Sequence, residues 1–448
     1  MDLHHRRLRR RALKKETTMH TFLRSRCALA ALVVLAFALV FAPRAALANG
    51  FFVQEVSGGG MGQAGAVVAG AGSPSSMFQN AANIGFLPGL QTELTLTTYI
   101  PTGTFTSAAG TSTDVRVVPI YVPHLFSSWR ATDWLAVGAG VFVDFGLAIH
   151  WPYDWEGRHI VIDSGLTSYT VNPNIAFGPF AGFVIAAGFD AKYGAVDIKR
   201  GLTLGQPPAG ELDVGNTVHL GGDTWGFGGN IGLMYQPADW VRLGAAYRST
   251  IKMSIDGGRA DFTVAEPFAP RFPDQDFSAT IVLPHLISTG VRFWPMETLS
   301  LELDFWATLW SSYDKLKFKF SEGLAEGPDK RIMEQTEEKN YEDFFQVRLG
   351  TEWWFHKHFA GRLGIMLDGN VVPDKTLDPM LPDGHRINTT IGFGTEWSGF
   401  FADLAYMLVA VLPRDTSGVE GNPIPGKYEF FTHVVSVSAG YRFDIAPL

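Results

Sequence analysis

The chain of 448 residues contains a single cysteine, Cys27. Cys27 lies in an apolar run near the N-terminus, which we interpret below as the core of an export signal. If export removes this run, the mature protein has no disulfide, no thiol nucleophile and no thiolate ligand for a metal. The scarcity of cysteine therefore excludes three kinds of site.

Long apolar runs and positive charge are also missing from most of the chain. After Phe41 no apolar run is long enough for a transmembrane helix. Residues 49–448 carry 26 Lys and Arg against 42 Asp and Glu, a net charge of −16. We expect no nucleic-acid partner, because binding to nucleic acid depends on cations that neutralise phosphates.

Neighbouring serine and histidine side chains are absent as well. No His-x-Ser or Ser-x-His occurs, so no single strand presents both groups side by side on one face. A pair on two adjacent strands stays open, and with it the alternative of an outer-membrane lipase-type enzyme. We expect a protein that is not an enzyme and has no catalytic residues.

Metal ligands are few. His356 and His358 form a two-histidine arm in a short turn, without an evident third ligand. The acidic segment 321–340 also carries Lys330 and Arg331, a mixture that is typical of a solvated loop. The sequence therefore predicts neither a metal nor a cofactor.

The N-terminus has the features of an export signal. An apolar run at 27–41 follows Arg24 and Arg26 and precedes an Ala-Leu-Ala sequence that ends at Ala48. We expect cleavage after Ala48, so that residues 1–48 comprise upstream residues and a signal peptide, with translation starting at Met1 or Met19. An uncleaved anchor is the alternative, but the run is short for a membrane span.

Residues 49–90 are predicted to form a plug. They contain ten glycines and one charged residue, Glu55, and they show neither clean alternation nor a long helical stripe. Small residues together with aromatic and turn residues suit a compact segment packed inside another structure. A flexible Gly-rich linker is the alternative, although linkers are usually richer in serine and charge.

The remainder, 91–448, reads as a series of strands. Apolar and polar side chains alternate between Gln91 and Ile100, which indicates a strand with one face toward lipid. Comparable segments follow, separated in turn by short turns and by long polar segments such as 201–222, 256–276 and 321–340. Counting these segments predicts fourteen strands, the last of them, at 428–443, closing against the first.

The lengths of the connections and the positions of the tryptophans indicate how the strands lie in a membrane. Short and long connections alternate strictly, so both ends of the chain fall on the periplasmic side. Some tryptophans adjoin short turns, and Trp151, Trp155 and Trp225 adjoin long segments, as two interfacial girdles would require. The sequence thus predicts a 14-stranded antiparallel transmembrane β-barrel, with the plug in its lumen, in the outer membrane of a Gram-negative bacterium.

Short motifs spread over 50–443 carry a resemblance. They are Gly60-Met61-Gly62-Gln63-Ala64, Phe145-Gly146-Leu147-Ala148, Asp154-Trp155-Glu156-Gly157-Arg158, Asp223-Thr224-Trp225-Gly226-Phe227-Gly228, Tyr247-Arg248-Ser249 and Leu381-Pro382-Asp383. In this order and spacing they resemble the FadL-type outer-membrane transporters of long-chain fatty acids and other hydrophobic compounds, which include toluene- and xylene-type channels.

The resemblance implies a passive uptake channel. Cargo would be captured in an apolar groove between external loops, pass the plug and leave sideways into the membrane through a gap at the third strand. An apolar path suits such cargo, because burying a methylene gains about 0.8 kcal/mol. A fatty acid and an aromatic or aliphatic hydrocarbon both stay open as cargo, since apolar pockets select by shape.

Partners follow from the same resemblance. It implies a hydrophobic small molecule or fatty acid as ligand, outer-membrane lipid around the barrel, and the barrel-assembly machinery during biogenesis. We expect a monomer, because a closed barrel has no free edge.

The resemblance also assigns a gating segment and a lateral opening. Where the family's plug reads Asn-Pro-Ala, this chain has Asn80-Ala81-Ala82, and the lost proline leaves a freer backbone with one more N–H donor. The predicted third strand, 134–150, is weakest at Asp144-Phe145-Gly146, where we expect the lateral opening. Either the strand bends there because Asp144 would be costly against lipid, or Asp144 simply faces the lumen.

Three residues are expected to contact the cargo. Arg200 and Arg386 match basic positions of the family and could pair with a fatty-acid carboxylate, since a buried unpaired charge is costly. Phe78 of the plug completes the set. The alternative is that both arginines lie at the rim and pair with acids such as Asp383.

Overall fold

The computed structural model describes residues 50–70, 72–202, 204, 215–266, 268–325 and 330–445. The predicted export signal, 1–48, lies outside these ranges, so its cleavage stays a prediction. Among the residues described, no helix is both long and apolar enough to cross a membrane.

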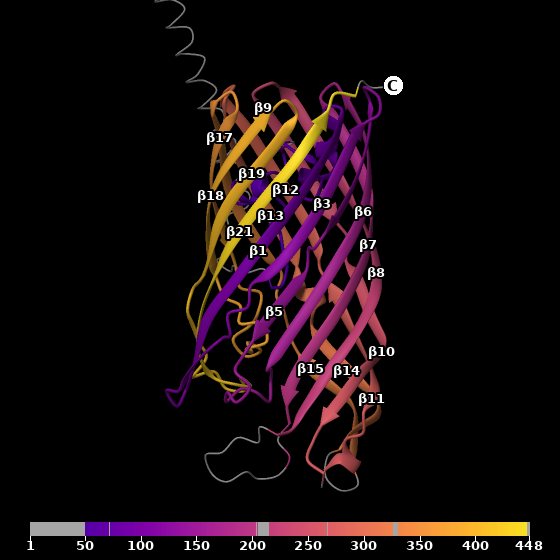
Figure 1. The fold of residues 1–448 in the computed structure, drawn as a ribbon, viewed down its shortest axis with the longest axis vertical. Coiled ribbons are helices and arrows are strands. Elements are labelled where there is room, and N and C mark those ends of the chain that lie inside the picture. The colour runs from indigo at the N-terminus through magenta and orange to yellow at the C-terminus, as the bar shows by residue number, and fades with distance from the viewer. Residues whose placement is uncertain are drawn as a thin grey trace, which may run out of the picture.

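The strands form one closed antiparallel barrel of 14 wall strands, tilted against the long axis (Figure 1). Nine wall strands are continuous: β1 (Leu90–Ser107), β3 (Ile120–Arg130), β6 (Asp163–Phe180), β7 (Phe183–Gly201), β8 (Thr217–Ala238), β17 (Phe359–Asp368), β18 (Arg386–Trp397), β19 (Phe400–Val411) and β21 (Gly426–Phe443). The last of these pairs with the first from Leu90↔Phe443 to Ser107↔Gly426, which closes the sheet. The predicted fold class is confirmed.

Five wall strands are interrupted and have two parts each. They are β4 (Leu135–Phe142) with β5 (Gly146–His150), β9 (Val241–Arg248) with β10 (Ile251–Thr263), β11 (Gln275–Leu283) with β12 (His285–Met296), β13 (Leu299–Leu309) with β14 (Lys315–Ala325), and β15 (Arg331–Glu338) with β16 (Phe344–His356). Short strands β2 (Ser112–Asp114) and β20 (Arg414–Asp415) add to the external ends, and 3-10 helices η3 (Ala269–Arg271) and η4 (Trp310–Ser312) lie in connections.

Alternation along the strands sorts side chains between lumen and lipid. In β1, Glu93 and Thr95 are buried in the lumen, whereas Leu94 and Leu96 are 60% and 47% exposed on the outer face. The outer face is thus apolar while the backbone bonds are satisfied between strands, as a membrane span requires.

Tryptophan placement matches the prediction only in part. Trp353 and Trp397 beside short turns and Trp225 at the other end are exposed on the barrel surface. Trp151 and Trp155 were expected in the external girdle, and this is wrong: both are buried and stack on each other at 4.2 Å. Each indole N–H finds a backbone carbonyl, which lets these large rings pack in the interior.

Several strands extend further than the sequence predicted. The segments 256–276 and 321–340 were expected to be loops, but β10, β11, β14 and β15 continue into them, and β8 begins inside 201–222. These extensions lie beyond the apolar band. Their ladders are supported by cross-strand pairs such as Lys315 with Glu338, at 3.1 Å, so pairing persists without apolar alternation.

Residues 50–70 and 72–89 lie inside the ring of strands, where Figure 1 shows the indigo segment. They form the short helix α2 (Gly58–Met61) and the 3-10 helices η1 (Pro74–Met77) and η2 (Ala81–Phe86). The first contacts β18, β19 and β21, and the last contacts β6, β7 and β8, so the segment bridges different parts of the wall. This position is consistent with a plug, whose role in closing the lumen stays a prediction.

Candidate functional site

The barrel wall is open next to the third wall strand. The ladder between β3 and β4 runs only from Arg130↔Ala136 to Leu125↔Val141, and β5 pairs with β6 alone. Across the residues that the structure describes, the outer half of β3, Ile120–His124, has β1 on one side and no strand partner on the other. The wall therefore has a gap between β3 and β5.

Asp144 occupies the interruption that makes this gap. Its side chain is buried in the lumen, where its carboxylate pairs with Lys192 and accepts a hydrogen bond of 3.0 Å from Thr170 Oγ1. Two alternatives were expected for this residue, a bend of the strand or a side chain that faces the lumen. The structure has both features: the strand is interrupted at Asp144, and the Asp144 side chain faces the lumen. Lys192 was not among the residues expected at the site, although alternation along β7 places it on the inner face.

The N-terminal segment pairs with the interrupted strand. Val53 N donates to Asp144 O at 2.8 Å, and Gly146 N donates to Phe51 O at 3.0 Å. Phe52 forms an isolated antiparallel bridge with Phe145. Backbone groups that the missing ladder would leave without partners are thus satisfied by the N-terminal segment.

A cavity of about 370 Å³ lies along the gap. Apolar side chains from the wall line most of it, including Ile120, Val122, Leu147, Ile149, Leu166, Met407, Val409 and Phe430. Gly50 to Glu55 border it from the lumen, and Arg116 and His150 lie at its edge. Its size and lining suit a hydrophobic compound, since ligand pockets of several hundred Å³ are typically apolar with few polar groups.

Arg386 borders this cavity but is already paired. Its Nε donates to Asp383 Oδ1 at 3.1 Å, and its Nη2 donates to Gly50 O at 3.1 Å. Gly50 N donates in turn to Asp383 Oδ2 at 3.1 Å. The arginine and the aspartate therefore hold the start of the described chain in place.

Arg200 lies elsewhere, in an ion-pair cluster at the external end. Its Nη1 is 2.5 Å from Glu337 Oε1, and Lys339 Nζ is 3.2 Å from the other oxygen of Glu337 and 3.1 Å from Asp378 Oδ2. Burial alone would raise the pKa of Glu337, but Arg200 and Lys339 outweigh it and lower this pKa to about 2. Burial likewise raises the pKa of Tyr313, which adjoins the cluster, to about 12.

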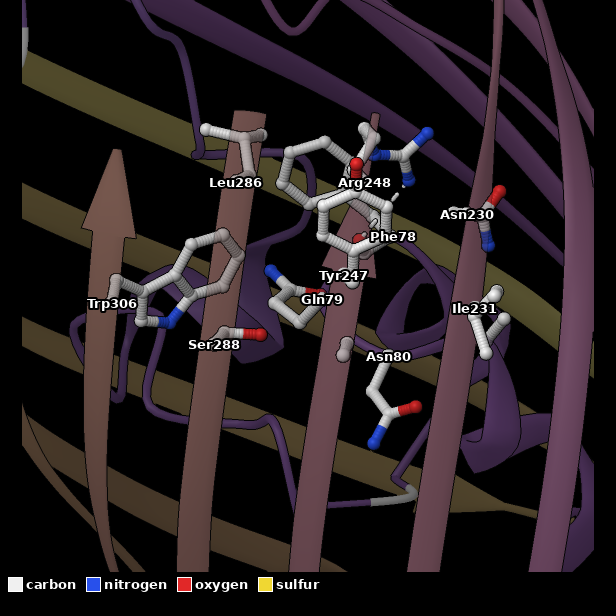
Figure 2. Close-up of a pocket in the computed structure, with 12 residues that line it drawn as sticks. Phe78, Gln79, Asn80, Asn230, Ile231, Tyr247, Arg248, Leu286, Ser288 and Trp306 are labelled. Atoms are coloured by element: carbon white, nitrogen blue, oxygen red, sulfur yellow. Dashed lines mark hydrogen bonds between the residues drawn. The ribbon is translucent and has the colours of Figure 1, made fainter. Parts of the chain in front are cut away.

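Phe78 lies deeper, within the N-terminal segment. Figure 2 shows it beside Arg248, whose Nη2 donates to Phe78 O at 3.4 Å. The pocket there has a volume of about 20 Å³, enough for a water molecule but not for a lipid chain. The Phe78 ring contacts Phe142 and Phe52, and through Phe52 it backs the larger cavity.

Asn80 fastens this segment to the wall. Its Oδ1 accepts a bond of 3.0 Å from Ala82 N, and its Nδ2 donates to Val68 O and Leu233 O, both at 3.0 Å. Gly232 faces it, and a Cβ at that glycine would lie 2.3 Å from Asn80 Oδ1. The close approach therefore requires glycine. Asn80, Ala81 and Ala82 thus form an anchored turn, and whether it moves stays a prediction.

Charged side chains in the inner half of the lumen hold other parts of the segment. Asp304 Oδ2 accepts from Val68 N at 3.0 Å, and Glu302 Oε1 accepts from Ala69 N at 2.6 Å. The buried ion pairs Arg292–Glu302 and Arg362–Asp403 continue this network. Inward-facing charges on predicted strands were the signal that could have revealed it.

Apart from the ion-pair cluster around Arg200, the outer half of the lumen is mostly apolar. Ile198, Leu220, Met253, Ile255, Phe277 and Phe318 are all buried there on inward faces of the strands. An aqueous pore would carry polar side chains at these positions. A closed outer-membrane barrel with an apolar outer lumen and a gap in its wall defines a channel for hydrophobic compounds.

Comparisons with known proteins agree with a channel for hydrophobic compounds. The chain belongs to the family described as "Outer membrane protein transport protein (OMPP1/FadL/TodX)", whose model matches residues 39–443. The long-chain fatty acid transport protein of Salmonella typhi is 25% identical over 401 residues, which cover 81% of this chain and 88% of that protein. That of Escherichia coli K12 is 24% identical over 412 residues, with 81% and 89% covered.

Solved structures share the fold. A Pseudomonas aeruginosa FadL homologue gives a TM-score of 0.75 at 19% identity, covering 88% of this chain and all of that one (100%). The Ralstonia pickettii toluene transporter TbuX gives 0.66 at 17% identity, with 88% and 99% covered. The chain is therefore an outer-membrane transporter of hydrophobic compounds, and its family comprises channels rather than enzymes.

Proposed function

We propose that this protein takes up long-chain fatty acids or similar hydrophobic compounds by passive diffusion. Cargo enters between the external loops, crosses the apolar outer lumen and leaves through the gap between β3 and β5 into the membrane. The cavity of about 370 Å³ along this gap is the observation that supports the proposal most strongly. The names of the sequence relatives from Salmonella typhi and Escherichia coli favour a fatty acid.

Energetics favour a sideways exit. A hydrocarbon chain that passed straight through the barrel would have to cross the polar inner half, where Glu302, Asp304, Arg348 and Arg362 are buried. A chain that leaves through the gap stays in apolar surroundings and keeps about 0.8 kcal/mol per methylene.

Ala148 offers a direct test, because it lines the cavity and its side chain is small. The substitution Ala148→Trp should fill the exit and reduce oleate uptake by cells at least about tenfold, a barrier of about 1.4 kcal/mol. Ala245→Trp places the same ring on β9, away from the cavity, and should leave uptake unchanged. Uptake that survives Ala148→Trp in an assembled barrel would refute exit through the gap.

Neutral hydrocarbons are a second candidate cargo. Arg386 is paired with Asp383, and Arg200 with Glu337, so each arginine already has a carboxylate partner. A cargo without a carboxylate would leave these pairs intact. The solved toluene transporter with the same fold makes this alternative concrete, and measuring uptake of oleate and of a neutral hydrocarbon in the same cells would distinguish the two.

A further inference from the structure

The outer face of β14 carries a row of lysines. Lys315, Lys317 and Lys319 point outward with side chains 43%, 52% and 64% exposed, while Phe318 and Phe320 between and beyond them are buried in the lumen. Alternation along the strand fixes this separation. The three ammonium groups therefore share one exterior surface.

These lysines lie directly outside the apolar band of the barrel. Strand β13 leads into β14, and β16 follows β15. The outward side chains of β13 and β16 are apolar, namely Leu301 on β13 and Phe345, Leu349 and Trp353 on β16. The outward face then changes to charged residues at Lys315 on β14 and at Glu338 on β15. This change marks the level where the headgroups of the outer leaflet begin.

Neighbouring strands extend the patch sideways. The ladder places Ser254 opposite Thr280, Thr280 opposite Lys317, and Lys317 opposite Thr336. Ser254 and Thr280 are 3.1 Å apart through their hydroxyl oxygens. Lys252, two residues before Ser254, is exposed on the same face. We call Lys252, Lys315, Lys317 and Lys319 the lysine patch.

Carboxylates only partly balance the lysine patch, because four lysines share this surface with three carboxylates: Glu334, Glu338 and Asp256, the last exposed on the same outward row of β10 as Lys252. Glu338 pairs with Lys315 at 3.1 Å, and Glu334 is shared by Lys317 at 3.4 Å and Lys319 at 3.6 Å. Lys252 has no ion pair with any described residue. Exposed pairs of this kind contribute little free energy, so a stronger anion can compete for the ammonium groups.

The patch is local. At the outer ends of β7 and β8, the outward residues include Asp197, 68% exposed, and Asp223, and residues 49–448 carry a net charge of −16. A cationic surface at headgroup level on an otherwise acidic protein points to an anionic membrane component. Serine and threonine hydroxyls between the lysines add hydrogen-bond donors for phosphate oxygens.

We propose that the lysine patch binds the phosphorylated headgroup of an outer-leaflet lipid, with the lipid chains lying against the apolar band below. Clustered basic side chains beside a membrane are the usual recognition element for such headgroups. This site is on the outer wall, so it is separate from the path of the cargo and does not depend on what the cargo is.

Purified full-length protein in detergent provides the test, with lipid A that carries both phosphates as the probe. The triple variant Lys252→Gln, Lys315→Gln and Lys317→Gln should bind lipid A at least about tenfold more weakly, measured by native mass spectrometry. The matched control Lys357→Gln, Lys375→Gln and Lys427→Gln has the same change of charge on exposed lysines elsewhere. It should bind like the unaltered protein.

Other arms identify the ligand chemistry. Dephosphorylated lipid A should bind as weakly to the unaltered protein as lipid A binds to the triple variant, and Glu334→Gln should not weaken binding. Three results would each overturn the proposal. The triple variant could bind lipid A as well as the unaltered protein does, or the triple and control variants could lose the same affinity for lipid A. Millimolar inorganic phosphate could also displace lipid A completely. Circular dichroism confirms that every variant keeps its β structure.

Discussion

At the scale of single residues, the candidate site depends on charges that are buried in pairs. Lys192 and Asp144 have side chains that are 0% and 1% exposed, and they face each other across the interruption of the third wall strand. A buried pair of this kind is weak evidence for stability, but loss of one partner leaves an uncompensated charge. The pair therefore holds Asp144 in the lumen and keeps the interruption where it is.

Lys192→Met should destabilise the barrel by about 3–5 kcal/mol, because Asp144 stays buried without its cation. Unfolding in urea from lipid vesicles measures this free energy. Lys199→Met changes a half-buried lysine of the same strand that has no ion pair with any described residue, and it should have little effect. The double variant Asp144→Asn with Lys192→Met should recover most of the lost stability, because it leaves no unpaired charge. If Lys192→Met alone is as stable as the unaltered protein, the pair does not hold the interruption.

Arg200→Ala should weaken oleate binding about tenfold, or about 1.4 kcal/mol, if this arginine meets the carboxylate of the cargo. Glu337 keeps Lys339 as a partner at 3.2 Å, so the external cluster should stay folded. Binding of a neutral hydrocarbon of similar size should hardly change. Arg259→Ala, on an exposed side chain of β10, is the matched control. No effect on oleate would remove Arg200 from the cargo site.

Residue types could be predicted from the sequence more readily than their partners. The sequence singled out Asp144 because a carboxylate inside a predicted strand is unusual, and it named Asp383 as a possible partner of the arginines. It could not pair Asp144 with Lys192, because these residues are 48 positions apart and meet only when strands pair in the correct register. Glu337, the partner of Arg200, lay in a segment expected to be a loop.

At the scale of elements, hydrogen bonds join the N-terminal segment to the wall. The wall strands satisfy most of their backbone groups by pairing with one another, and the groups at the interruption near Asp144 are paired with the N-terminal segment. Deleting residues 50–89 should therefore leave an assembled barrel that conducts small ions. Single-channel recordings in planar bilayers measure the conductance. An assembled barrel that stays closed would show that the external loops, and not this segment, block the lumen.

Strands inside the membrane were predictable because their lipid-facing side chains must be apolar, whereas those facing the lumen need not be. The fourteen-strand count followed from that rule, and it is confirmed. Outside the membrane the rule no longer applies, since water satisfies an outward polar side chain on either a strand or a loop. The extensions of β10, β11, β14 and β15 were therefore missed, although alternating Lys and Phe in β14 carried a period of two.

At the scale of the whole molecule, one barrel contains two different interiors. Buried ion pairs fill the half that holds the N-terminal segment, and apolar side chains line most of the external half, apart from the ion-pair cluster around Arg200. The gap between β3 and β5 lies where these halves meet, since Asp144 faces Lys192 there while the cavity beside it is mostly apolar. On the proposed route, hydrophobic cargo would leave through the wall and would not cross the polar half toward the periplasm.

The most direct measurement closes this gap reversibly. Cysteines at Val122 on β3 and Ile149 on β5, both of which line the cavity, can be joined by a reducible thiol cross-linker after Cys27→Ser removes the only native cysteine. Ser127 and Ala139, opposite each other in the intact β3–β4 ladder, form the control pair. Exit through the gap predicts that cross-linking the first pair stops oleate uptake, that reduction restores it, and that the control pair has no effect. Uptake that continues with the first pair fully cross-linked would contradict it.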